Sequence, residues 1–139
     1  MCGGYNPIKD LYKTRLYSIC KWRNSSHEVW MKGPKGSVIP KSILEKPPTA
    51  ELRPNQTDQD SLPPYEVLDS ILESLIENDM PISEIVKEGH DYNIVKKIEK
   101  LVYQSEYKRF QSAPGVHLTK KSFQLSRRYP IVQNWRDKL

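Results

Sequence analysis

The sequence predicts a mainly α chain made of helices and connecting loops. Three stretches carry apolar residues at helical spacing, whereas no segment has the alternation or the β-branched run of a confident strand. The chain is also lean in core-forming residues, with 37% hydrophobic residues and 11 prolines among 139 residues. A helical chain with so thin a core is typical of one portion of a larger domain.

The first predicted helix runs from about residue 7 to residue 23. Asn6 followed by Pro7 matches an N-cap and the first helical position. A helical stripe follows, made of Tyr12, Leu16, Ile19 and Cys20. The polar residues 24–37 predict a surface loop anchored by Trp30, and residues 40–45 predict a single helical turn.

A long proline-rich loop covers residues 46–64, within the stretch KPPTAELRPNQTDQDSLPPY. It carries acidic residues at Glu51, Asp58 and Asp60, with Glu66 nearby. Proline restricts both its own backbone and that of the preceding residue, so this loop is stiffer than its length suggests. Long loops inside compact domains are either functional or disordered, and a stiff, charged one favours a lid or binding loop.

Three helices are predicted after this loop. The strongest prediction begins at Tyr65 and ends at Asn78-Asp79, with a continuous apolar stripe. Residues 83–88 predict a short helix closed by Gly89, and Asp91 is the expected N-cap of a third long helix. That third helix is expected to end with residues 106–109, followed by a loop-rich tail.

The formal net charge is +5, and much of the excess lies in a basic tail over residues 112–139. Such a tail suits phosphates of nucleic acids or nucleotides, although a solvated basic face explains it equally well. Cys2 and Cys20 form no framework with the three scattered histidines, so free thiols are expected and a metal cluster is not. No apolar run is long enough to span a membrane, and no signal-peptide pattern opens the chain.

Four groups of residues are candidates for chemistry. Lys46 stands before a rigid turn and suits a phosphate, and the loop acids suit Mg²⁺ held together with phosphates. Residues 106–109 end a helix with two cations, and Gly3 and Gly4 permit a close backbone approach to a ligand. Each group also has a purely structural explanation. In order, these are an exposed lysine, solvated acids, a helix end stabilised by the dipole and an ordinary turn, and no group is decisive by itself.

Four segments in their order resemble the C-terminal end of glutamine-dependent NAD⁺ synthetases. They are GGYNPIKDLYKT, VIPKSILEKPPTAELRPNQTDQDSLPPYEVLD, EYKRFQSAPG and RRYPIVQNWR, and they cover nearly the whole chain except residues 25–37. The resemblance implies the helical portion of an α/β, PP-loop ATP pyrophosphatase-like synthetase domain whose central parallel sheet is largely missing here. It also implies a ligase that amidates deamido-NAD⁺, using ATP, Mg²⁺ and ammonia from glutamine. A cytoplasmic location is expected from the free thiols, which fit a reducing compartment.

The resemblance also implies roles for individual residues. Lys46 is expected at the ATP phosphates as the catalytic residue. The loop from Glu51 to Pro64 is expected to be a lid whose contacts with ATP are Asp58, Asp60 and Ser61. Asp58 and Asp60 are also weak candidates for metal ligands. The deamido-NAD⁺ site is expected to consist of Lys108, Tyr107, Gly3, Gly4 and Asn6.

The family's Ser-Gly-Gly pyrophosphate loop and its glutaminase residues do not occur in this sequence. We therefore expect a terminal fragment beginning at an internal methionine, and no NAD⁺ synthesis by the chain alone. The expected partners are the rest of the synthetase, the glutaminase domain and further copies in a homo-oligomer, without nucleic acid or membrane. The alternative is a small basic helical module that binds nucleic acid or protein, which the late cations interspersed with tyrosines would permit.

Overall fold

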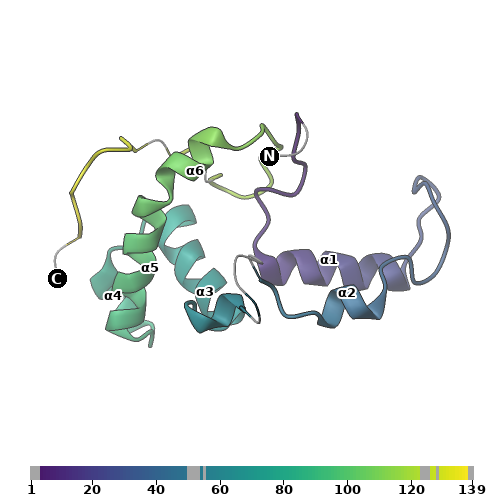
Figure 1. The fold of residues 1–139 in the computed structure, drawn as a ribbon, viewed down its shortest axis with the longest axis horizontal. Coiled ribbons are helices and arrows are strands. Elements are labelled where there is room, and N and C mark those ends of the chain that lie inside the picture. Colours follow the sequence, from purple (N-terminus) through teal and green to yellow (C-terminus); the bar gives the residue numbers. More distant parts are fainter. Residues whose placement is uncertain (1–3, 50–53, 55, 123–125, 128, 138–139) are drawn as a thin grey trace. The chain divides into compact units, whose positions relative to one another are not determined.

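The computed structural model describes residues 4–49, 54, 56–122, 126–127 and 129–137. Every regular element in these residues is helical, and none of them forms a strand, as the sequence predicts (Figure 1). The chain divides into two compact units, one of residues 12–65 and one of residues 1–11 and 66–139. Each unit is described by itself.

The unit of residues 12–65 contains helix α1 (Lys13–Ser25), the short helix α2 (Lys41–Glu45) and the 3₁₀ turn η1 (Asp58–Asp60). The α1–α2 loop is closed by Asn24, whose Oδ1 accepts the N–H groups of Val38 and Ile39 at 3.0 and 2.9 Å. Helix α2 confirms the helical turn expected at residues 40–45. The expectation that Trp30 anchors the loop is wrong, because its side chain is 74% exposed.

The predicted start of the first helix is also wrong by six residues. Residues 7–10 form a turn, Asn6 accepts the N–H of Ile8 at 3.3 Å, and the helix begins only at Lys13. The preceding residue, Tyr12, has an extended backbone (φ −63°, ψ 150°). The carboxylate of Asp10 is held by residues 118 and 119, and this long-range contact overrides the local N-cap signal.

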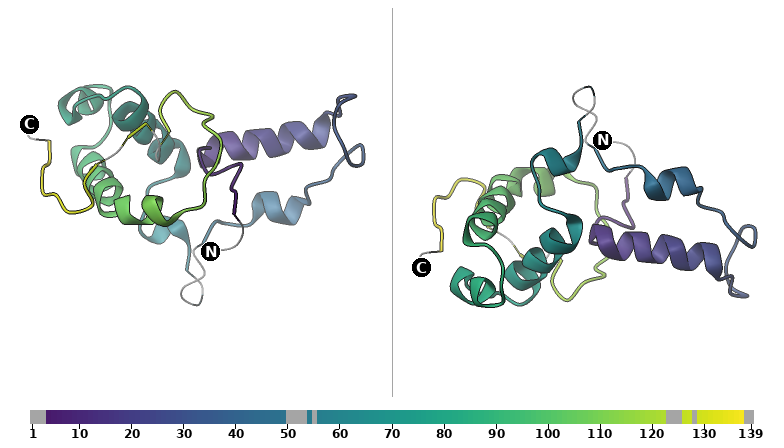
Figure 2. Two further views of the ribbon diagram at one scale, coloured as in Figure 1. Left: turned by 90° about the horizontal axis from the view of Figure 1, so that it is seen from above. Right: turned by 90° about the horizontal axis from the view of Figure 1, so that it is seen from below.

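The second unit is built around helix α3 (Tyr65–Leu72), which continues as the π-helical segment η2 (Glu73–Glu77). Helix α4 (Ile82–Lys87) packs against η2 and against helix α5 (Tyr92–Gln104), and Figure 2 shows α4 and α5 side by side. The core consists of side chains that are at most 1% exposed: Ile71, Ile76, Ile82, Ile85, Val95 and Ile98. Burial of each such side chain contributes roughly 1.5–3 kcal/mol, so these helices are held mainly by this cluster.

Local end signals in this unit behave as the sequence predicts. The π segment ends where Asn78 N–H donates to Glu73 O at 3.2 Å, and Asp79 then adopts a positive φ of 50°. Gly89 closes α4 with a φ of 102°, which is costly for residues with a Cβ. Asp91 caps α5 by accepting the Ile94 N–H at 3.0 Å.

The prediction that residues 106–109 end the third long helix is wrong. These residues lie in a separate helix, α6 (Glu106–Gln111). Ser105 separates the two helices, and its backbone leaves the helical conformation (φ −89°, ψ 5°). The break is stabilised by Arg109, which pairs with the buried Glu106 at 2.5 Å and donates to the carbonyl of Val102. Contacts of one arginine with residues three and seven positions before it therefore mark a boundary that helical spacing does not reveal.

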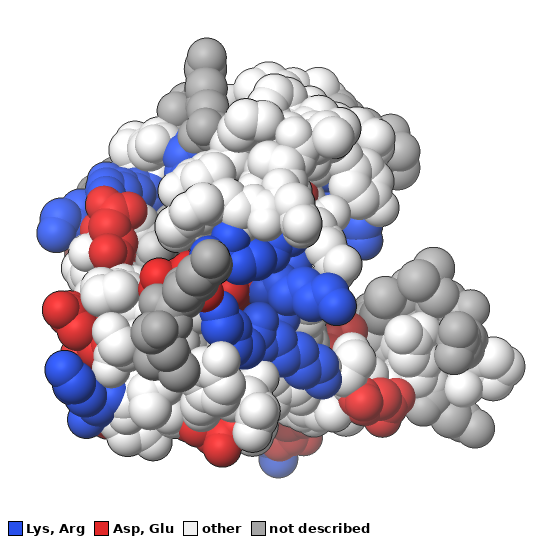
Figure 3. Space-filling model, turned by 90° about the vertical axis from the view of Figure 1, so that its left-hand side faces the viewer, with Lys and Arg blue, Asp and Glu red and all other residues white. Residues whose placement is uncertain are grey.

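In the part of the chain that is described, no helix combines the length and apolarity needed to cross a bilayer. Cys20 is a free thiol, whereas Cys2 lies outside the described residues. Charge is unevenly spread over the surface, and Figure 3 shows lysine and arginine side chains gathered near the middle of one face, beside acidic ones.

Candidate functional site

An open groove in the unit of residues 12–65 brings together two of the predicted site residues, Lys46 and Asp58. Its volume is about 260 Å³. The rest of the lining comes from α1, α2 and the proline segment, and consists of Lys13, Tyr17, Ile43, Pro47, Pro48 and Thr49. Two lysines and an aspartate thus line one cavity, which is called the lysine groove below.

Lys46 reaches the lysine groove because the chain changes conformation there. Helix α2 ends at Glu45, and Lys46 follows with an extended backbone (φ −62°, ψ 123°). Pro47 explains this end, since a residue before proline is disfavoured in the α region. The exposed Lys46 therefore stands at the junction between a helix and a stiff segment.

Asp58 is fixed from two sides. Its N–H donates to the carbonyl of Pro48 at 3.0 Å, and the hydroxyl of Tyr65 donates to its Oδ2. The first contact draws the acid toward the proline segment that follows Lys46. The second orients the carboxylate, which leaves less conformational entropy to lose when a ligand binds.

Asp60 and Ser61 have different surroundings and are not part of the groove lining. The carboxylate of Asp60 accepts the Thr57 N–H at 2.7 Å and the Thr57 hydroxyl at 2.9 Å. These hydrogen bonds lower the pKa of Asp60. Ser61 donates to the carbonyl of Asp58 at 3.3 Å. Both residues thus shape the turn that presents Asp58, and their predicted ATP contacts stay predictions.

Lys13 and Tyr17 are lining residues that the sequence reasoning missed. Lys13 is the first residue of α1, and Tyr17 lies four residues later, on the same face of the helix. Lys13 does fall within the segment GGYNPIKDLYKT that carries the resemblance, which was the only available signal. Their convergence with Lys46 joins residues some thirty positions apart in the sequence.

The other predicted site residues lie in the second unit. Tyr107 and Lys108 are exposed on α6, and the Lys108 ammonium lies 6.0 Å from the centre of the Tyr107 ring. Gly4 and Asn6 lie in the N-terminal segment, and Asn6 N–H donates to the carbonyl of Pro114 at 2.8 Å. Gly3 lies outside the described residues, as do parts of the predicted lid loop and basic tail, namely 50–53, 55, 123–125, 128 and 138–139.

Lys9 and Gly115 fasten the N-terminal segment to the chain that leaves α6. Lys9 donates to the Ser112 hydroxyl at 2.7 Å and to the Ala113 carbonyl at 2.5 Å, and partial burial lowers the pKa of its ammonium. A Cβ at Gly115 would lie 2.3 Å from the backbone oxygen of Asn6, so a larger residue cannot fit without a shift. The segment with Gly4 and Asn6 is therefore held against the residues that follow Lys108.

Among the described residues, no group of three or more His, Cys, Asp or Glu side chains could hold a metal ion. Mg²⁺ differs from most protein-bound metals because it often uses only one or two carboxylates together with substrate phosphates. Asp58 fits that pattern as a single carboxylate beside lysines in the lysine groove. What the groove offers chemically is a place for phosphate oxygens.

Comparison with known proteins gives a consistent set of similarities. A family model described as NAD synthase matches residues 1–112. The glutamine-dependent NAD(+) synthetase of Rhodobacter capsulatus is 62% identical over 137 residues, covering 99% of this chain and 25% of that protein. The corresponding protein of Thermotoga maritima is 45% identical over 139 residues, covering 100% and 23%. The chain therefore spans about a quarter of the length of the curated relatives it matches.

A solved structure supports the same similarity. It is the glutamine-dependent NAD⁺ synthetase from Acinetobacter baumannii in complex with adenosine diphosphate. The TM-score is 0.54 at 37% identity, and the match covers 94% of this chain and 21% of that one.

Proposed function

Because the chain belongs to the NAD synthase family, we propose that it forms part of the synthetase domain of a glutamine-dependent NAD⁺ synthetase. The proposed reaction is the ATP-dependent amidation of the nicotinate carboxylate of deamido-NAD⁺, with AMP and pyrophosphate as the other products. One observation carries the proposal: within the segment that matches the family, the lysine groove unites Lys13, Lys46 and Asp58.

The lysine groove suits the phosphate part of ATP. Two lysines supply cations that do not depend on a particular donor geometry, and lysine acts on phosphates as a point charge. The volume of about 260 Å³ is below the usual range for a drug-sized ligand, so it matches phosphate groups better than a whole nucleotide. The adenosine diphosphate in the A. baumannii relative supports an adenine nucleotide as the ligand.

Asp58 is the residue of the groove that would hold Mg²⁺, together with phosphate oxygens. Its carboxylate already has one fixed orientation through Tyr65, and a single carboxylate is sufficient for Mg²⁺ when phosphates complete the shell. Asp60, whose oxygens both accept hydrogen bonds from Thr57, is the weaker metal candidate of the two.

The chemistry explains why cations are needed at this place. A carboxylate is a poor acyl donor, and ATP supplies the leaving group that lets ammonia replace it. Negative charge grows on the departing phosphates, and preorganised cations stabilise that charge where it develops. Lys46 would have this role together with Lys13, because both residues line the groove that the phosphates would occupy.

Deamido-NAD⁺ is proposed to bind at the second unit, on Lys108 and Tyr107 and on the segment with Gly3, Gly4 and Asn6. Exposed aromatic and cationic groups that lie next to each other suit a dinucleotide, which offers both flat rings and phosphates. The hydrogen bond from Asn6 to Pro114 supports a common site, since it joins this segment to the chain after α6.

The proposed partners are the rest of the synthetase domain and a glutaminase domain that supplies ammonia, in a cytoplasmic homo-oligomer. The relatives that match the chain are themselves named as glutamine-dependent enzymes. This membership favours NAD⁺ synthesis over the alternative of a small basic module that binds nucleic acid or protein.

A segment exchange tests the proposal. The matching quarter of the R. capsulatus relative is replaced by this chain, and we expect the chimaera to form NAD⁺ from ammonia and from glutamine. In the chimaera, Lys46→Ala should raise KM for ATP roughly 10- to 100-fold, as expected for loss of a charged hydrogen-bonding partner. Lys41→Ala is the matched control, because Lys41 lies in the helix that Lys46 directly follows and forms an exposed ion pair with Glu45 at 3.3 Å.

Two results would contradict the proposal. One is a folded chimaera that binds ATP but forms no NAD⁺ from ammonia. The other is an ATP dependence in Lys46→Ala that equals that of Lys41→Ala.

A further inference from the structure

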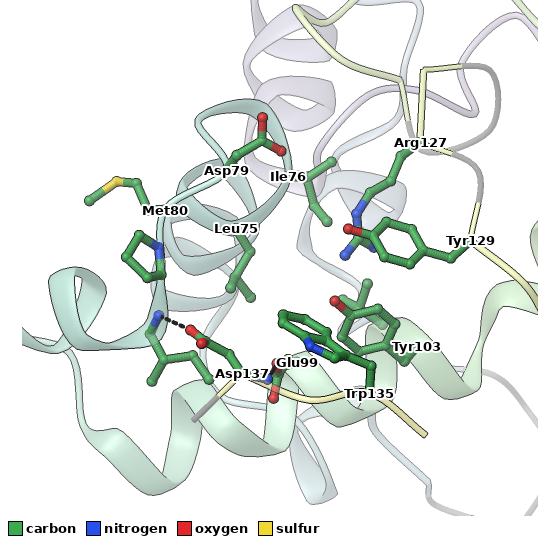
Figure 4. Close-up of a pocket in the computed structure, with 13 residues that line it drawn as sticks. Leu75, Ile76, Asp79, Met80, Glu99, Tyr103, Arg127, Tyr129, Trp135 and Asp137 are labelled. Atoms are coloured by element: carbon green, nitrogen blue, oxygen red, sulfur yellow. Dashed lines mark hydrogen bonds between the residues drawn. The ribbon is translucent and has the colours of Figure 1, made fainter. Parts of the chain in front are cut away.

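The second unit contains a cavity that the proposed reaction does not use. It has a volume of about 200 Å³ and lies between α5, the end of η2 and the C-terminal segment (Figure 4). One wall consists of three aromatic side chains, Tyr103, Tyr129 and Trp135, and the opposite side carries the aliphatic Leu75 and Ile76. This cavity is called the aromatic pocket below.

The geometry of the three rings suits a flat, apolar guest. Tyr103 meets Tyr129 at 5.3 Å and Trp135 at 6.4 Å between ring centres, with interplanar angles of 76° and 77°. These edge-to-face contacts hold the rings at fixed angles around the space. An apolar cavity of about 150 Å³ is enough for benzene, so the aromatic pocket has room for one ring with a small polar group.

Arg127 gives the pocket a polar feature. Its guanidinium carbon lies 5.0 Å from the centre of Tyr103 and 4.3 Å from that of Tyr129. Its Nη1 is buried and has no hydrogen-bond partner among the residues that are described. A buried donor without an acceptor is unfavourable, so a ligand that brings an acceptor to Nη1 would gain that interaction.

The acidic side chains of the pocket are already compensated. Asp79 forms an ion pair with Lys121, and Glu99 accepts from Lys96 at 3.4 Å and from the N–H of Asp137 at 3.1 Å. The carboxylate of Asp137 accepts the first N–H of α4 at 2.8 Å, drawn as the dashed line in Figure 4. The guanidinium with its open donor is thus the group that selects the charge of a ligand.

We propose that the aromatic pocket binds a small aromatic carboxylate. The carboxylate accepts from Arg127 Nη1, and the ring lies between the aromatic wall and the aliphatic side formed by Leu75 and Ile76. Arg127, Tyr129 and Trp135 follow the segment matched by the family model, which ends at residue 112. The pocket therefore joins residues inside that match, such as Leu75, Ile76 and Tyr103, to residues that follow it.

The experiment uses the 139-residue chain and a set of ligands that share a ring but differ in charge. Benzoate, benzamide and benzylammonium are titrated while the amide and indole N–H signals are followed by NMR. We expect benzoate to bind at least tenfold more tightly than the other two, with the Trp135 indole signal shifting. Acetate, which has the carboxylate but no ring, should also bind at least tenfold more weakly than benzoate.

Two variants locate the effect. Arg127→Gln should weaken benzoate at least tenfold. Arg136→Gln should leave the affinity for benzoate within twofold, because Arg136 also lies over Tyr103, at 4.7 Å, but does not line the pocket. Should Arg127→Gln lose its dispersed NMR spectrum, the ligand series on the unmodified chain decides. Equal affinity for benzoate and benzamide, tighter binding of benzylammonium, or no binding of benzoate by the folded chain would each overturn the proposal.

Discussion

Removal of the Asp10 carboxylate should loosen the junction between the N-terminal segment and residues 118–119. Asp10 is 4% exposed, and its Oδ2 accepts three hydrogen bonds: from Leu118 N–H at 2.7 Å, from Thr119 N–H at 2.9 Å and from the Thr119 hydroxyl at 2.9 Å. In Asp10→Ala these donors lose their common acceptor. The local stability of the second unit should fall as a result.

The structure allows the magnitude to be worked out donor by donor. The Thr119 hydroxyl also lies 3.1 Å from the Lys121 carbonyl and can donate there instead, so its loss is small. The two backbone N–H groups have no such substitute among the described contacts, and a hydrogen bond to a charged group contributes roughly 1.5–3 kcal/mol. Leu118 is 50% exposed, so water can replace part of the hydrogen bonding that its N–H loses. A loss of about 3 kcal/mol follows, which is a large share of a typical stability of about 5–15 kcal/mol.

Native-state hydrogen exchange is the direct assay, because it reports the two amides individually. The Leu118 and Thr119 amides should exchange about a hundredfold faster in Asp10→Ala, the ratio that corresponds to about 3 kcal/mol. Asp10→Asn is the matched control: its amide oxygen can still accept from the same donors, so most of the protection should remain. Unchanged exchange in Asp10→Ala, or equal losses in both variants, would refute the reasoning.

Three further predictions concern other contacts. Gly115→Ala should destabilise the second unit by about 1–3 kcal/mol in urea unfolding, because its Cβ would lie 2.3 Å from a backbone oxygen. Gly4→Ala is the control and should change the stability little, because the space around Gly4 is open. Equal effects of the two substitutions would contradict the steric argument. The pKa of Asp60 is lowered, so its hydrogen bonds to Thr57 are fully present at and above the ordinary carboxyl pKa and are lost as the pH falls through the lower value. The Thr57 amide signal should therefore shift only below the pH at which an ordinary aspartate titrates, and not at all in Asp60→Asn. Burial raises the pKa of Tyr103 to about 12, so the unfolded chain releases this proton at a lower pH than the folded chain, and stability should fall as the pH rises from about 10 to 12. An absorbance titration should show one late-titrating tyrosine, which Tyr103→Phe removes. Normal titration of every tyrosine would count against this prediction.

The sequence was most informative where structure depends on neighbours in the chain. The apolar stripe of α3 and η2, the cap by Asp91 and the positive φ of Gly89 each follow from a short-range pattern. The same holds for the extended backbone of Lys46, which the following proline dictates. Recognition of the family also needed only the order of motifs, since residues 1–112 match its model.

The late start of α1, by contrast, depends on the contact between Asp10 and residues 118–119, about 108 positions away. Neither Lys13 nor Tyr17 carries a local signal for the lysine groove, and both become lining residues only because α1 and the proline segment meet there. The aromatic pocket joins α5 to the C-terminal segment in the same manner.

By itself, the sequence determined the helical class, most helix ends, the family and the placement of Lys46 before a rigid turn. Only the tertiary structure decided which side chains share a cavity, and it moved one helix start. The physical reason is range: helix caps, proline and glycine act within a few residues. Grooves and buried carboxylates instead depend on contacts between distant segments, whose free energies outweigh local preferences.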